Sequence, residues 1–398
     1  MLTVAEARAA ILDAMPAAAT ESVELTHATG RVLQQTVLAE RDQPPFDRVM
    51  MDGIAIAFAE LDAGKREFSI QAMQAAGDPA LQLDAGNCVE IMTGASLPEG
   101  ADCIVPVERI AMNDGNAVIE TDYEAAKDQF IHPRGSDHAK GAHLLTAGSR
   151  ISPMDIAIIA SCGLTDVTCS AAPTIRVIST GNELVAPGEP IEPHQIRMSN
   201  GPALVALLEK HGFTKSEHDH IVDDQAELRT RIAEHLEAAN VLILSGGVSM
   251  GKADYVPAVL AELGVKVVFH KISQRPGKPM WFGIGKEGQA VFALPGNPVS
   301  ALVCCRQYVV EALNAAAGLR ETPPEFASLA QEYVFKPQLT CFLPVKLISG
   351  VGGQTLAMPV QTNTSGDFAS LSGTDGYVEL PLETTTFAAG TGVVLRRW

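Results

Sequence analysis

The sequence predicts a multidomain protein of the α/β class that contains a parallel sheet, with strand-rich parts before and after it. Apolar, β-branched runs at 241–244, 265–272 and 291–294 are typical of strands that are buried on both faces. A segment of helical length, 254–263, separates the first two runs, and such alternation favours parallel pairing. Residues 22–131 instead carry short β-prone runs broken by Gly, Pro and Asp.

The chain begins with a predicted helix. Thr3 and Glu6 have the spacing of a capping box, and a modest apolar stripe follows until Pro16. After the β-rich segment, a second helix is predicted at 151–163, with Pro153 near its start. The predicted strands between these helices are 67–72, 88–93, 103–107 and 117–121.

Pro173 marks a linker into the α/β part, where a strand at 174–179 and a helix at 202–211 continue the alternation. Glycine-marked turns follow the three buried strands, at 244–249, 275–279 and 294–298. Ligands of open α/β sheets bind at the carboxyl ends of the strands, so we expect the binding site at these turns. None of them matches a Walker or Gly-x-Gly-x-x-Gly motif, which gives little support to a kinase-like or Rossmann dehydrogenase function.

Three helix starts carry polar residues beside these strand ends. Asp224 forms an N-terminal box with Glu227, Asp254 begins the next helix, and Asn297 precedes Pro298 at the last one. Helix capping, worth about 1 kcal/mol for each residue, accounts for all three polar side chains. Their position supports a second interpretation, because helix N-termini also bind phosphates and other anions.

The C-terminal part contains predicted strands without helices, which indicates a small β-barrel or sandwich. The hydroxyl-rich segment at 362–367 has the composition of a plain loop. The alternative is that its hydroxyls donate hydrogen bonds to a ligand. The predicted strands are 327–334, 340–348, 355–360, 376–382 and 392–397.

Composition and charge exclude several classes of protein. With 46% hydrophobic residues the chain is globular, and its formal net charge of −18 argues against nucleic acid or an anionic membrane as partner. No apolar run approaches the roughly 20 residues of a membrane span and no signal pattern begins the chain, so we expect a cytoplasmic protein. The seven cysteines lack Cys-x-x-Cys spacing and are expected to be reduced, buried thiols.

Polar residues in and after the β-rich segment have two interpretations. Asp47 and Asp52 lie in a Pro-rich approach to a predicted Asp-Gly turn, and turn chemistry accounts for them. Thr93 and Ser96 either donate to an oxyanion or cap their loop. The segment 134–137 has the composition of a solvated loop, and the histidines near it lack the spacing of a zinc site.

Several short sequence motifs, each different, occur along the chain in one order. They are Pro-Pro-Phe-Asp with Met-Asp-Gly (44–53), Met-Thr-Gly-Ala (92–95), Arg-Gly-x-Asp (134–137), Ser-Thr-Gly-Asn-Glu-Leu (179–184), Ser-Gly-Gly-Val-Ser-x-Gly-x-x-Asp-Tyr (245–255), Pro-Gly-Lys-Pro (276–279) and Leu-Pro-Gly-Asn-Pro-Val-Ser (294–300). Together they resemble the molybdopterin molybdenumtransferases, which complete the synthesis of the molybdenum cofactor. The resemblance covers essentially the whole chain.

The resemblance implies a homodimer of elongated subunits, with a site between the α/β domain of one subunit and the N-terminal part of the other. The domains it implies are a discontinuous helical domain I at 1–22 and 132–170, a β-rich domain II at 23–131, an α/β domain III at 171–321 that resembles molybdopterin adenylyltransferase, and a β-barrel domain IV at 322–398.

The resemblance also implies a reaction, in which molybdate is joined to the dithiolene of adenylylated molybdopterin and AMP is released. A divalent ion, expected to be Mg²⁺, assists the cleavage of the phosphoanhydride by neutralising charge. Molybdopterin adenylyltransferase and the apoproteins of molybdoenzymes are the protein partners that such an enzyme would meet.

Residues that match the family motifs receive expected roles. Those expected in catalysis are Asp52, Thr93, Asp137, Glu183, Arg275 and Lys278. Those expected to hold the substrate are Arg134, Ser245, Gly246, Gly247, Ser249, Pro295, Gly296, Asn297 and Pro298, since glycine turns and cations bind phosphates and oxyanions. Asp224 and Asp254 are the expected ligands of Mg²⁺.

Several positions differ from the family pattern. Ile54 replaces a Tyr that many members have, Ser136 replaces a Glu, and Arg275 replaces a Lys. Arginine still binds oxyanions, so that replacement is mild, whereas Ser136 removes a carboxylate from its loop. Residues 48–50 are also atypical, which bears on substrate positioning near Asp52.

Two other functions remain compatible with the sequence. The fold of the α/β domain is shared with hydrolases of nicotinamide nucleotides, although the N-terminal motifs argue against such an activity. A non-catalytic scaffold is the other alternative, because gephyrin uses this architecture to anchor receptors. The presence of Asp52, Asp224, Asp254, Lys278 and the three glycine turns favours catalysis.

Overall fold

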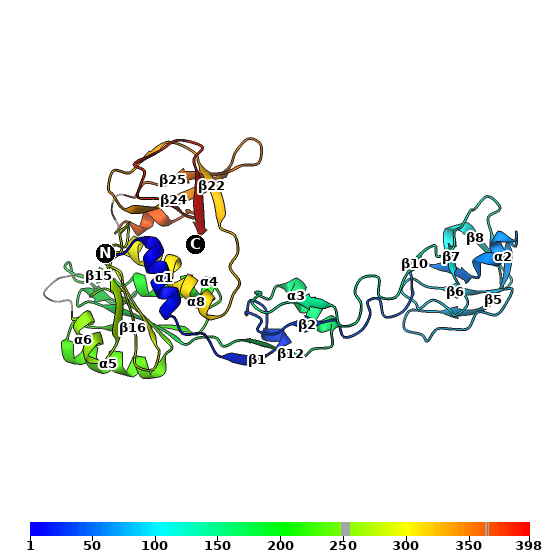
Figure 1. The fold of residues 1–398 in the computed structure, drawn as a ribbon, viewed down its shortest axis with the longest axis horizontal. Helices are drawn as coiled ribbons and strands as arrows, with labels where there is room; N and C mark the ends of the chain where they lie inside the picture. The colour runs from blue at the N-terminus through cyan, green and yellow to red at the C-terminus, as the bar shows by residue number, and fades with distance from the viewer. Residues whose placement is uncertain (248–254, 363, 365) are drawn as a thin grey trace. The chain divides into compact units, whose positions relative to one another are not determined.

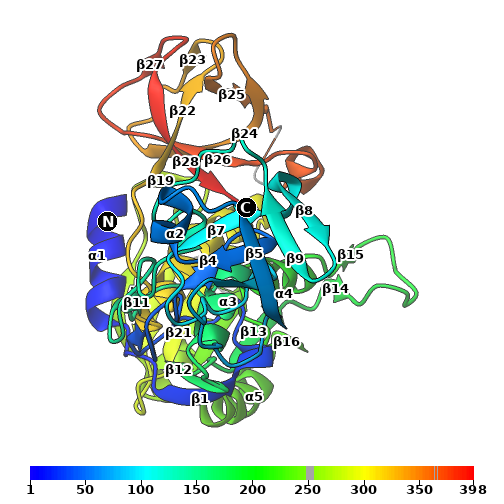
Figure 2. The same ribbon diagram turned by 90° about the vertical axis from the view of Figure 1, so that its right-hand side faces the viewer.

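A computed structural model describes residues 1–247, 255–362, 364 and 366–398. The chain divides into two compact units, which we describe separately. The core unit comprises Met1–Gln34, Gly148–Ile151 and Val167–Trp398, and the inserted unit comprises Gln35–Ala147 and Ser152–Asp166. Figures 1 and 2 label the elements of both units. The four-domain division expected from the sequence stays a prediction.

A six-stranded sheet in the order β16-β13-β17-β21-β20-β18 forms the centre of the core unit. Neighbours from β16 to β21 pair in parallel, as the alternating pattern predicts. The short strand β20 was not predicted, and it runs antiparallel between β21 and β18. The bounds are β13 (Ile175–Thr180), β16 (Ser216–Ile221), β17 (Val241–Ser245), β18 (Lys266–His270), β20 (Trp281–Ile284) and β21 (Ala290–Leu294).

Helices cover both faces of this sheet, which explains why every residue of β17 and β21 is buried. Along β17, Val241 and Ile243 join a core with α1, α4, α7 and α8, whereas Leu242 and Leu244 join a second core with α5 and α6. The helices are α1 (Val4–Ala14), α4 (Asn200–Lys210), α5 (Gln225–Ala238), α6 (Val256–Glu262), α7 (Pro298–Cys304) and α8 (Val310–Ala316). A π-helical turn, η3 (Cys305–Val309), joins α7 to α8.

Local capping signals identify two of these helices correctly. Thr3 and Glu6 form the reciprocal bonds of a capping box at the start of α1. The side chain of Asp224 accepts hydrogen bonds from the backbone of Ala226 and Glu227 at the start of α5. Asn297 occupies the N-cap position of α7, but its side chain makes no capping hydrogen bond, so that part of the prediction was wrong.

The C-terminal strands close into a barrel, because β24 pairs with its neighbour β25 and also with β26, which lies at the far end of the strand order. Its interior is a separate core that includes Leu343, Val345 and Val378. The ring is formed by β22 (Glu325–Leu329), β24 (Thr340–Ser349), β25 (Thr355–Pro359), β26 (Gly376–Leu380) and β28 (Gly392–Arg397). Smaller elements of the core unit are β1 (Thr20–Glu24), η1 (Leu25–His27), β12 (Asp166–Ser170), β14 (Leu184–Val185), β15 (Ile196–Arg197), β19 (Gln274–Arg275), β23 (Tyr333–Val334), η4 (Phe368–Leu371) and β27 (Thr386–Phe387).

The inserted unit contains a six-stranded sheet in the order β7-β4-β6-β5-β9-β8. Its strands are β4 (Gly53–Ile56), β5 (Glu67–Gln74), β6 (Asn87–Ile91), β7 (Cys103–Pro106), β8 (Ile110–Asn113) and β9 (Asn116–Ile119). Smaller elements are β2 (Val37–Leu38), β3 (Arg48–Val49), α2 (Phe58–Asp62), η2 (Val107–Arg109), β10 (Ile131–His132), β11 (His143–Leu145) and α3 (Pro153–Ser161). The predicted strands are present.

The strand β4 corrects the predicted Asp-Gly turn at Asp52 and Gly53. Gly53 begins the strand and pairs with Pro106 and Ile91 on either side. A Cβ atom on Gly53 would lie only 1.9 Å from the carbonyl oxygen of Val105. Gly53 is therefore needed for close packing of two strands, and Asp52 lies just before a buried strand.

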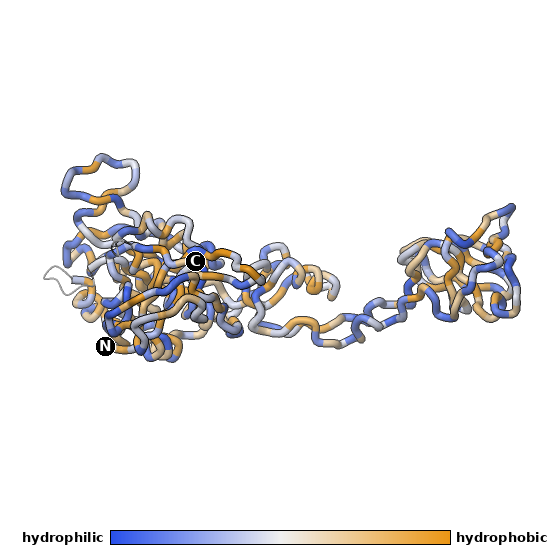
Figure 3. The backbone as a smooth tube through the Cα atoms, turned by 90° about the horizontal axis from the view of Figure 1, so that it is seen from above, coloured by the Kyte–Doolittle hydropathy of each residue, from blue (hydrophilic) through white to orange (hydrophobic). Residues whose placement is uncertain are grey.

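Two further sequence predictions agree with the structure. All seven cysteines are buried and free. Hydropathy changes over short distances along the backbone (Figure 3), and no helix in the described ranges has the length and apolar character needed to cross a membrane.

His211, a partly buried histidine at the end of α4, predicts a pH-dependent stability. Burial first, then the nearby cations of Arg306, Lys210 and Arg150, lowers the pKa of His211 from 6.5 to about 4. The unfolded chain therefore binds a proton at a higher pH than the folded chain, so stability falls as the pH is lowered from 6.5 to 4. We expect His211→Gln to flatten the dependence of Tm on pH in this window.

The control for this prediction is His194→Gln, which changes an exposed histidine in the same unit. Tm is measured by calorimetry at several pH values for the wild type and both variants. Equal slopes in the His211 and His194 variants would show that the partly buried imidazole does not cause the acid sensitivity.

Candidate functional site

A pocket of about 430 Å³ lies at the carboxyl ends of β13, β17 and β21, and we call it the strand-end pocket. Parallel pairing brings its walls together, since Ser245 pairs with Ser179 on one side and Leu294 on the other. Glu183, at the end of the loop before β14, also contributes a carboxylate. The residues that line the strand-end pocket and that the sequence predicted are Glu183, Ser245, Gly246, Gly296, Asn297 and Pro298.

The backbone of two glycine turns forms the floor of the strand-end pocket. Gly246 has a φ of +106°, and a Cβ atom there would lie 2.7 Å from the carbonyl oxygen of Thr180. A Cβ atom on Gly296 would lie 3.6 Å from the Cα of Gly246, so the two turns pack backbone to backbone. Gly247 and Pro295 are the neighbours of these residues in the same turns. Such turns suit a ligand that the main chain binds closely.

Two polar residues of the strand-end pocket were not assigned from the sequence. The amide of Asn200 donates to Ser245 Oγ at 2.9 Å and to the carbonyl oxygen of Gly296 at 2.8 Å, and so joins the two turns. The hydroxyl of Thr180 is buried and has no hydrogen-bond partner within the described part of the chain. An unpaired buried hydroxyl is uncommon in a folded protein and fits a site that a polar ligand completes.

A second pocket, of about 510 Å³, lies between the Arg275–Pro279 turn and the barrel, and we call it the turn–barrel pocket. Arg275, Lys278 and Lys336 line it, and all three are exposed. Asn297 lines this pocket and the strand-end pocket, so the two adjoin. The turn–barrel pocket is therefore rich in cations, whereas the strand-end pocket offers backbone groups, hydroxyls and a carboxylate.

The position of the Arg275–Pro279 turn corrects the prediction that it lies at the carboxyl edge of the α/β sheet. The turn begins at β19, and β19 pairs in parallel with β24 of the barrel, Arg275 opposite Cys341. Sequence reasoning missed this pairing because β19 has two residues. It also missed Lys336 and Tyr333, which come from the barrel and carry no motif of their own.

Asp224 and Asp254, the expected magnesium ligands, stay a prediction. One oxygen of Asp224 accepts both capping bonds of α5, at 3.0 Å and 2.9 Å. Asp254 and the substrate-binding candidate Ser249 lie outside the described residues. In the parts of the chain that can be searched, no group of three or more His, Cys, Asp or Glu side chains could hold a metal ion. Because Asp254 is not among the described residues, the structure does not test the expected pair of ligands.

In the inserted unit, Asp52 and Thr93 form a close pair. One oxygen of Asp52 accepts from the backbone N–H of Thr93 at 2.6 Å and from its hydroxyl at 2.7 Å. The hydroxyl bond first, and then the backbone bond, lowers the pKa of Asp52 below its ordinary value. Asp52 is therefore a carboxylate near neutral pH, with an orientation that Thr93 fixes.

The loop of Arg134 and Asp137 carries a second polar cluster in the same unit. Arg134 pairs with Asp42 at 2.8 Å, and its backbone N–H donates to Asp47 at 2.7 Å. Asp137 contacts His132 at 3.0 Å. The strand β3 connects this loop to the Thr93 loop, because Arg48 pairs with His132 on one side and Ser96 on the other. The site candidates of the inserted unit thus lie on segments that adjoin the atypical residues 48–50. These candidates are Asp52, Thr93, Arg134 and Asp137.

Comparison with known proteins identifies the family. A molybdopterin molybdenumtransferase from Synechocystis is 37% identical over 400 residues, which covers 100% of both chains. The chain belongs to the molybdopterin molybdenumtransferase family. A second member of the family, from Haemophilus influenzae, is 34% identical and covers 83% of this chain and 82% of its own.

Models of the family's parts match the chain in the same order. They are the "MoeA N-terminal region (domain I and II)" at 2–163, a "probable molybdopterin binding domain" at 176–315 and the "MoeA C-terminal region (domain IV)" at 327–395. The crystal structure of a MoeA protein from Pyrococcus horikoshii has a TM-score of 0.82 and 25% identity, and covers 100% of both chains. A molybdenum cofactor biosynthesis protein from Pyrococcus furiosus, at 16% identity and a TM-score of 0.61, shares the fold.

Proposed function

We propose that this protein is a molybdopterin molybdenumtransferase that joins molybdate to the dithiolene of adenylylated molybdopterin and releases AMP. The observation that carries the proposal is the pair of adjoining pockets with Asn297 in both walls. One substrate carries a phosphoanhydride and the other is a separate oxyanion, so two neighbouring anion sites of different character are required. The family of the chain supports the same function.

The strand-end pocket is the proposed site of the adenylyl phosphates. Backbone N–H groups of the two glycine turns, with the hydroxyl of Ser245, would bind the phosphate oxygens, while the N–H of Gly246 itself donates to the carbonyl oxygen of Leu294 and joins the turns. Gly247 would contribute from the same turn. Pro295 and Pro298 restrict the backbone of the second turn. In the proposed reaction water attacks the phosphoanhydride and the bond to AMP breaks, and Glu183, which lines this pocket, would accept the proton of that water.

The turn–barrel pocket is the proposed site of molybdate. Arg275 is able to bind an oxyanion through two N–H groups, and Lys278 adds a compact charge from the same turn. Lys336 adds a third cation from the barrel. Because the two pockets adjoin at Asn297, molybdate would be held next to the dithiolene end of a substrate whose phosphates lie in the strand-end pocket.

The polar clusters of the inserted unit have a proposed role in a homodimer. Asp52 with Thr93, and Arg134 with Asp137, would complete the site of the partner subunit, as the resemblance implies. The lowered pKa of Asp52 keeps it charged, which suits the orientation of a protonated or metal-bound group. Asp224 and Asp254 remain proposed ligands of Mg²⁺, which would neutralise phosphate charge when bound. Molybdopterin adenylyltransferase and molybdoenzyme apoproteins remain proposed partners.

A reconstitution experiment tests this function against the alternatives. The purified protein is incubated with adenylylated molybdopterin, molybdate and Mg²⁺, and in a parallel reaction with a nicotinamide nucleotide. We expect release of AMP and formation of cofactor that activates an apo-molybdoenzyme. Deamidation of the nicotinamide nucleotide would instead indicate a nucleotide hydrolase, and the absence of both products would favour a scaffold.

A further inference from the structure

The π-helical turn η3 lies directly behind the turn–barrel pocket. Within it, Gln307 and Tyr308 are 1% exposed, although both side chains are polar. A π-helical turn adds a residue to a helix and is often found at functional sites. Buried polar groups lower stability unless they are hydrogen-bonded, so the partners of these two side chains show what they contribute.

Tyr308 supports the Arg275–Pro279 turn through a buried glutamine. Its hydroxyl donates to the side-chain oxygen of Gln274, which is 0% exposed. The side-chain nitrogen of Gln274 donates to the carbonyl oxygen of Pro276 at 3.1 Å and also contacts Cys304 Sγ at 3.5 Å. The amide of Gln274 therefore has partners at both ends, and one of them is the backbone of the turn.

Cys304 completes the contact with the turn. Its thiol lies 3.8 Å from the carbonyl oxygen of Gly277 and is held protonated, because burial raises its pKa above the ordinary value. A Cβ atom on Gly277 would lie 2.3 Å from this sulfur. The two central residues of the turn, Pro276 and Gly277, thus rest on buried side chains, and the cations Arg275 and Lys278 flank them.

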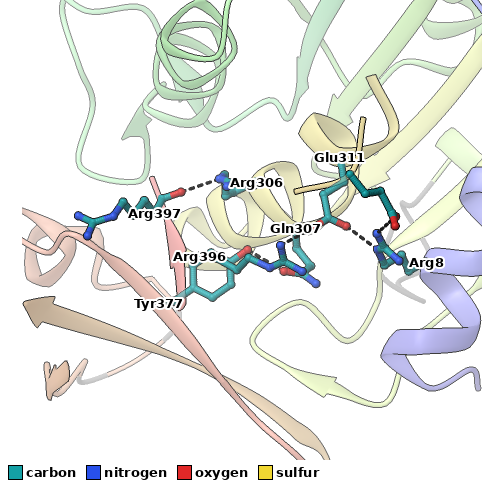
Figure 4. Close-up of polar contacts among 8 residues, drawn as sticks. Arg8, Arg306, Gln307, Glu311, Tyr377, Arg396 and Arg397 are labelled. Atoms are coloured by element: carbon teal, nitrogen blue, oxygen red, sulfur yellow. Dashed lines mark hydrogen bonds and ion pairs between the residues drawn. The ribbon is translucent and has the colours of Figure 1, made fainter. Parts of the chain in front are cut away.

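The other side of η3 is fixed to the barrel, as Figure 4 shows. The hydroxyl of Tyr377 donates to Gln307 at 2.8 Å, and Arg306 Nε donates to the carbonyl oxygen of Arg397 at 2.6 Å. Residues 306–308 therefore contact the Arg275–Pro279 turn, through Gln274, on one side and strands β26 and β28 of the barrel on the other. A displacement of the turn relative to the barrel would break these bonds, which favours one separation between Lys278 and Lys336.

We propose that Gln274 and Tyr308 are positioning residues that hold the cations of the Arg275–Pro279 turn at the distance from the barrel that an oxyanion requires. The inference rests on the proposed function, in which this pocket holds molybdate. Gln274 lines the turn–barrel pocket and Tyr308 lies behind it, but neither side chain is charged, so the expected effect on an oxyanion acts through Arg275 and Lys278.

The first test compares two variants that each remove one buried hydroxyl. Tyr308→Phe breaks the bond to Gln274 on the turn side of η3, and Tyr377→Phe breaks the bond to Gln307 on its barrel side. We expect Tyr308→Phe to raise the molybdate concentration for half-maximal AMP release by roughly tenfold or more, since small misplacements of binding groups are costly. The KM for adenylylated molybdopterin is expected to change less than twofold, whereas Tyr377→Phe should lower Tm without this selective effect.

A second variant separates positioning from stability. In the double variant Gln274→Met/Tyr308→Phe both members of the buried hydroxyl–amide pair become apolar, which costs less stability than removing one of them. The carbonyl oxygen that loses the bond from Gln274 belongs to Pro276, which is partly exposed. We expect the double variant to fold, with the same selective loss for molybdate. The inference would be overturned if Tyr308→Phe and the double variant both bound molybdate as tightly as Tyr377→Phe does.

Direct binding keeps this inference distinct from the proposed function. Molybdate alone is titrated into each protein, and its affinity is measured by calorimetry. If the wild type released no AMP but bound molybdate, and Tyr308→Phe weakened that binding, the proposed function would fail while the positioning role stood. If the wild type released AMP and Tyr308→Phe left molybdate binding unchanged, the positioning role would fail alone.

Discussion

Lys278→Met is expected to reduce molybdate-dependent AMP release by about 10²-fold to 10³-fold, the usual effect of removing one group that binds developing or fixed negative charge. The ammonium of Lys278 lies in the turn–barrel pocket beside Arg275 and is exposed. Its loss should leave the free energy of unfolding within about 0.5 kcal/mol of the wild type, as for most surface substitutions. Steady-state AMP release and urea unfolding measure the two effects.

The matched control is Lys346→Met, which removes an exposed lysine of the barrel that does not line the turn–barrel pocket. It should keep wild-type activity. Arg275→Lys restores the residue common in the family and should lower activity by less than tenfold, because lysine keeps the charge and loses only the second N–H contact with the oxyanion. Comparable activities of the Lys278 and Lys346 variants would remove Lys278 from the site.

Gly53→Ala is expected to destabilise the inserted unit by about 3 kcal/mol or more, the upper range for overpacking. The added Cβ atom would lie 1.9 Å from the carbonyl oxygen of Val105, and the backbone of β7 would have to move. A flexible side chain could rotate away from such a contact, but a paired strand cannot. Denaturant unfolding measures the loss, and hydrogen exchange should show weaker protection at 103–106.

Gly115→Ala provides the comparison for this prediction. Gly115 also has a positive φ, of +82°, but a Cβ atom there would meet no atom within 4 Å. Its substitution should therefore cost only the left-handed backbone term, about 1 to 2 kcal/mol. A Gly53 variant no less stable than the Gly115 variant would contradict the close packing of β4 on β7.

The sequence predicted those parts of the fold that depend on neighbouring residues. The capping box of Thr3 and Glu6 identified α1, and β-branched runs identified β17 and β21, because these signals act over a few residues. The strand β4 and the pairing of β19 with β24 were missed. Both depend on contacts between residues far apart in the chain, and short strands contain too few residues to show a period.

The candidate site was predictable to a similar extent. Glycine turns after buried strands placed Ser245, Gly246 and Gly296 together, because parallel strands end at one edge of a sheet. Asn200 and Lys336 gave no signal, since each reaches its pocket from a helix start or a barrel loop without a motif. For Asp224, the sequence offered capping and metal binding, and the structure demonstrates the capping.

The closed barrel has a consequence for how the protein behaves at high concentration. Because β24 pairs with both β25 and β26, the ring presents no open ladder to which a strand of another molecule could add. The open edges of the two large sheets are β16 and β18 in one and β7 and β8 in the other. At β18, the exposed charge of Lys266 opposes such addition.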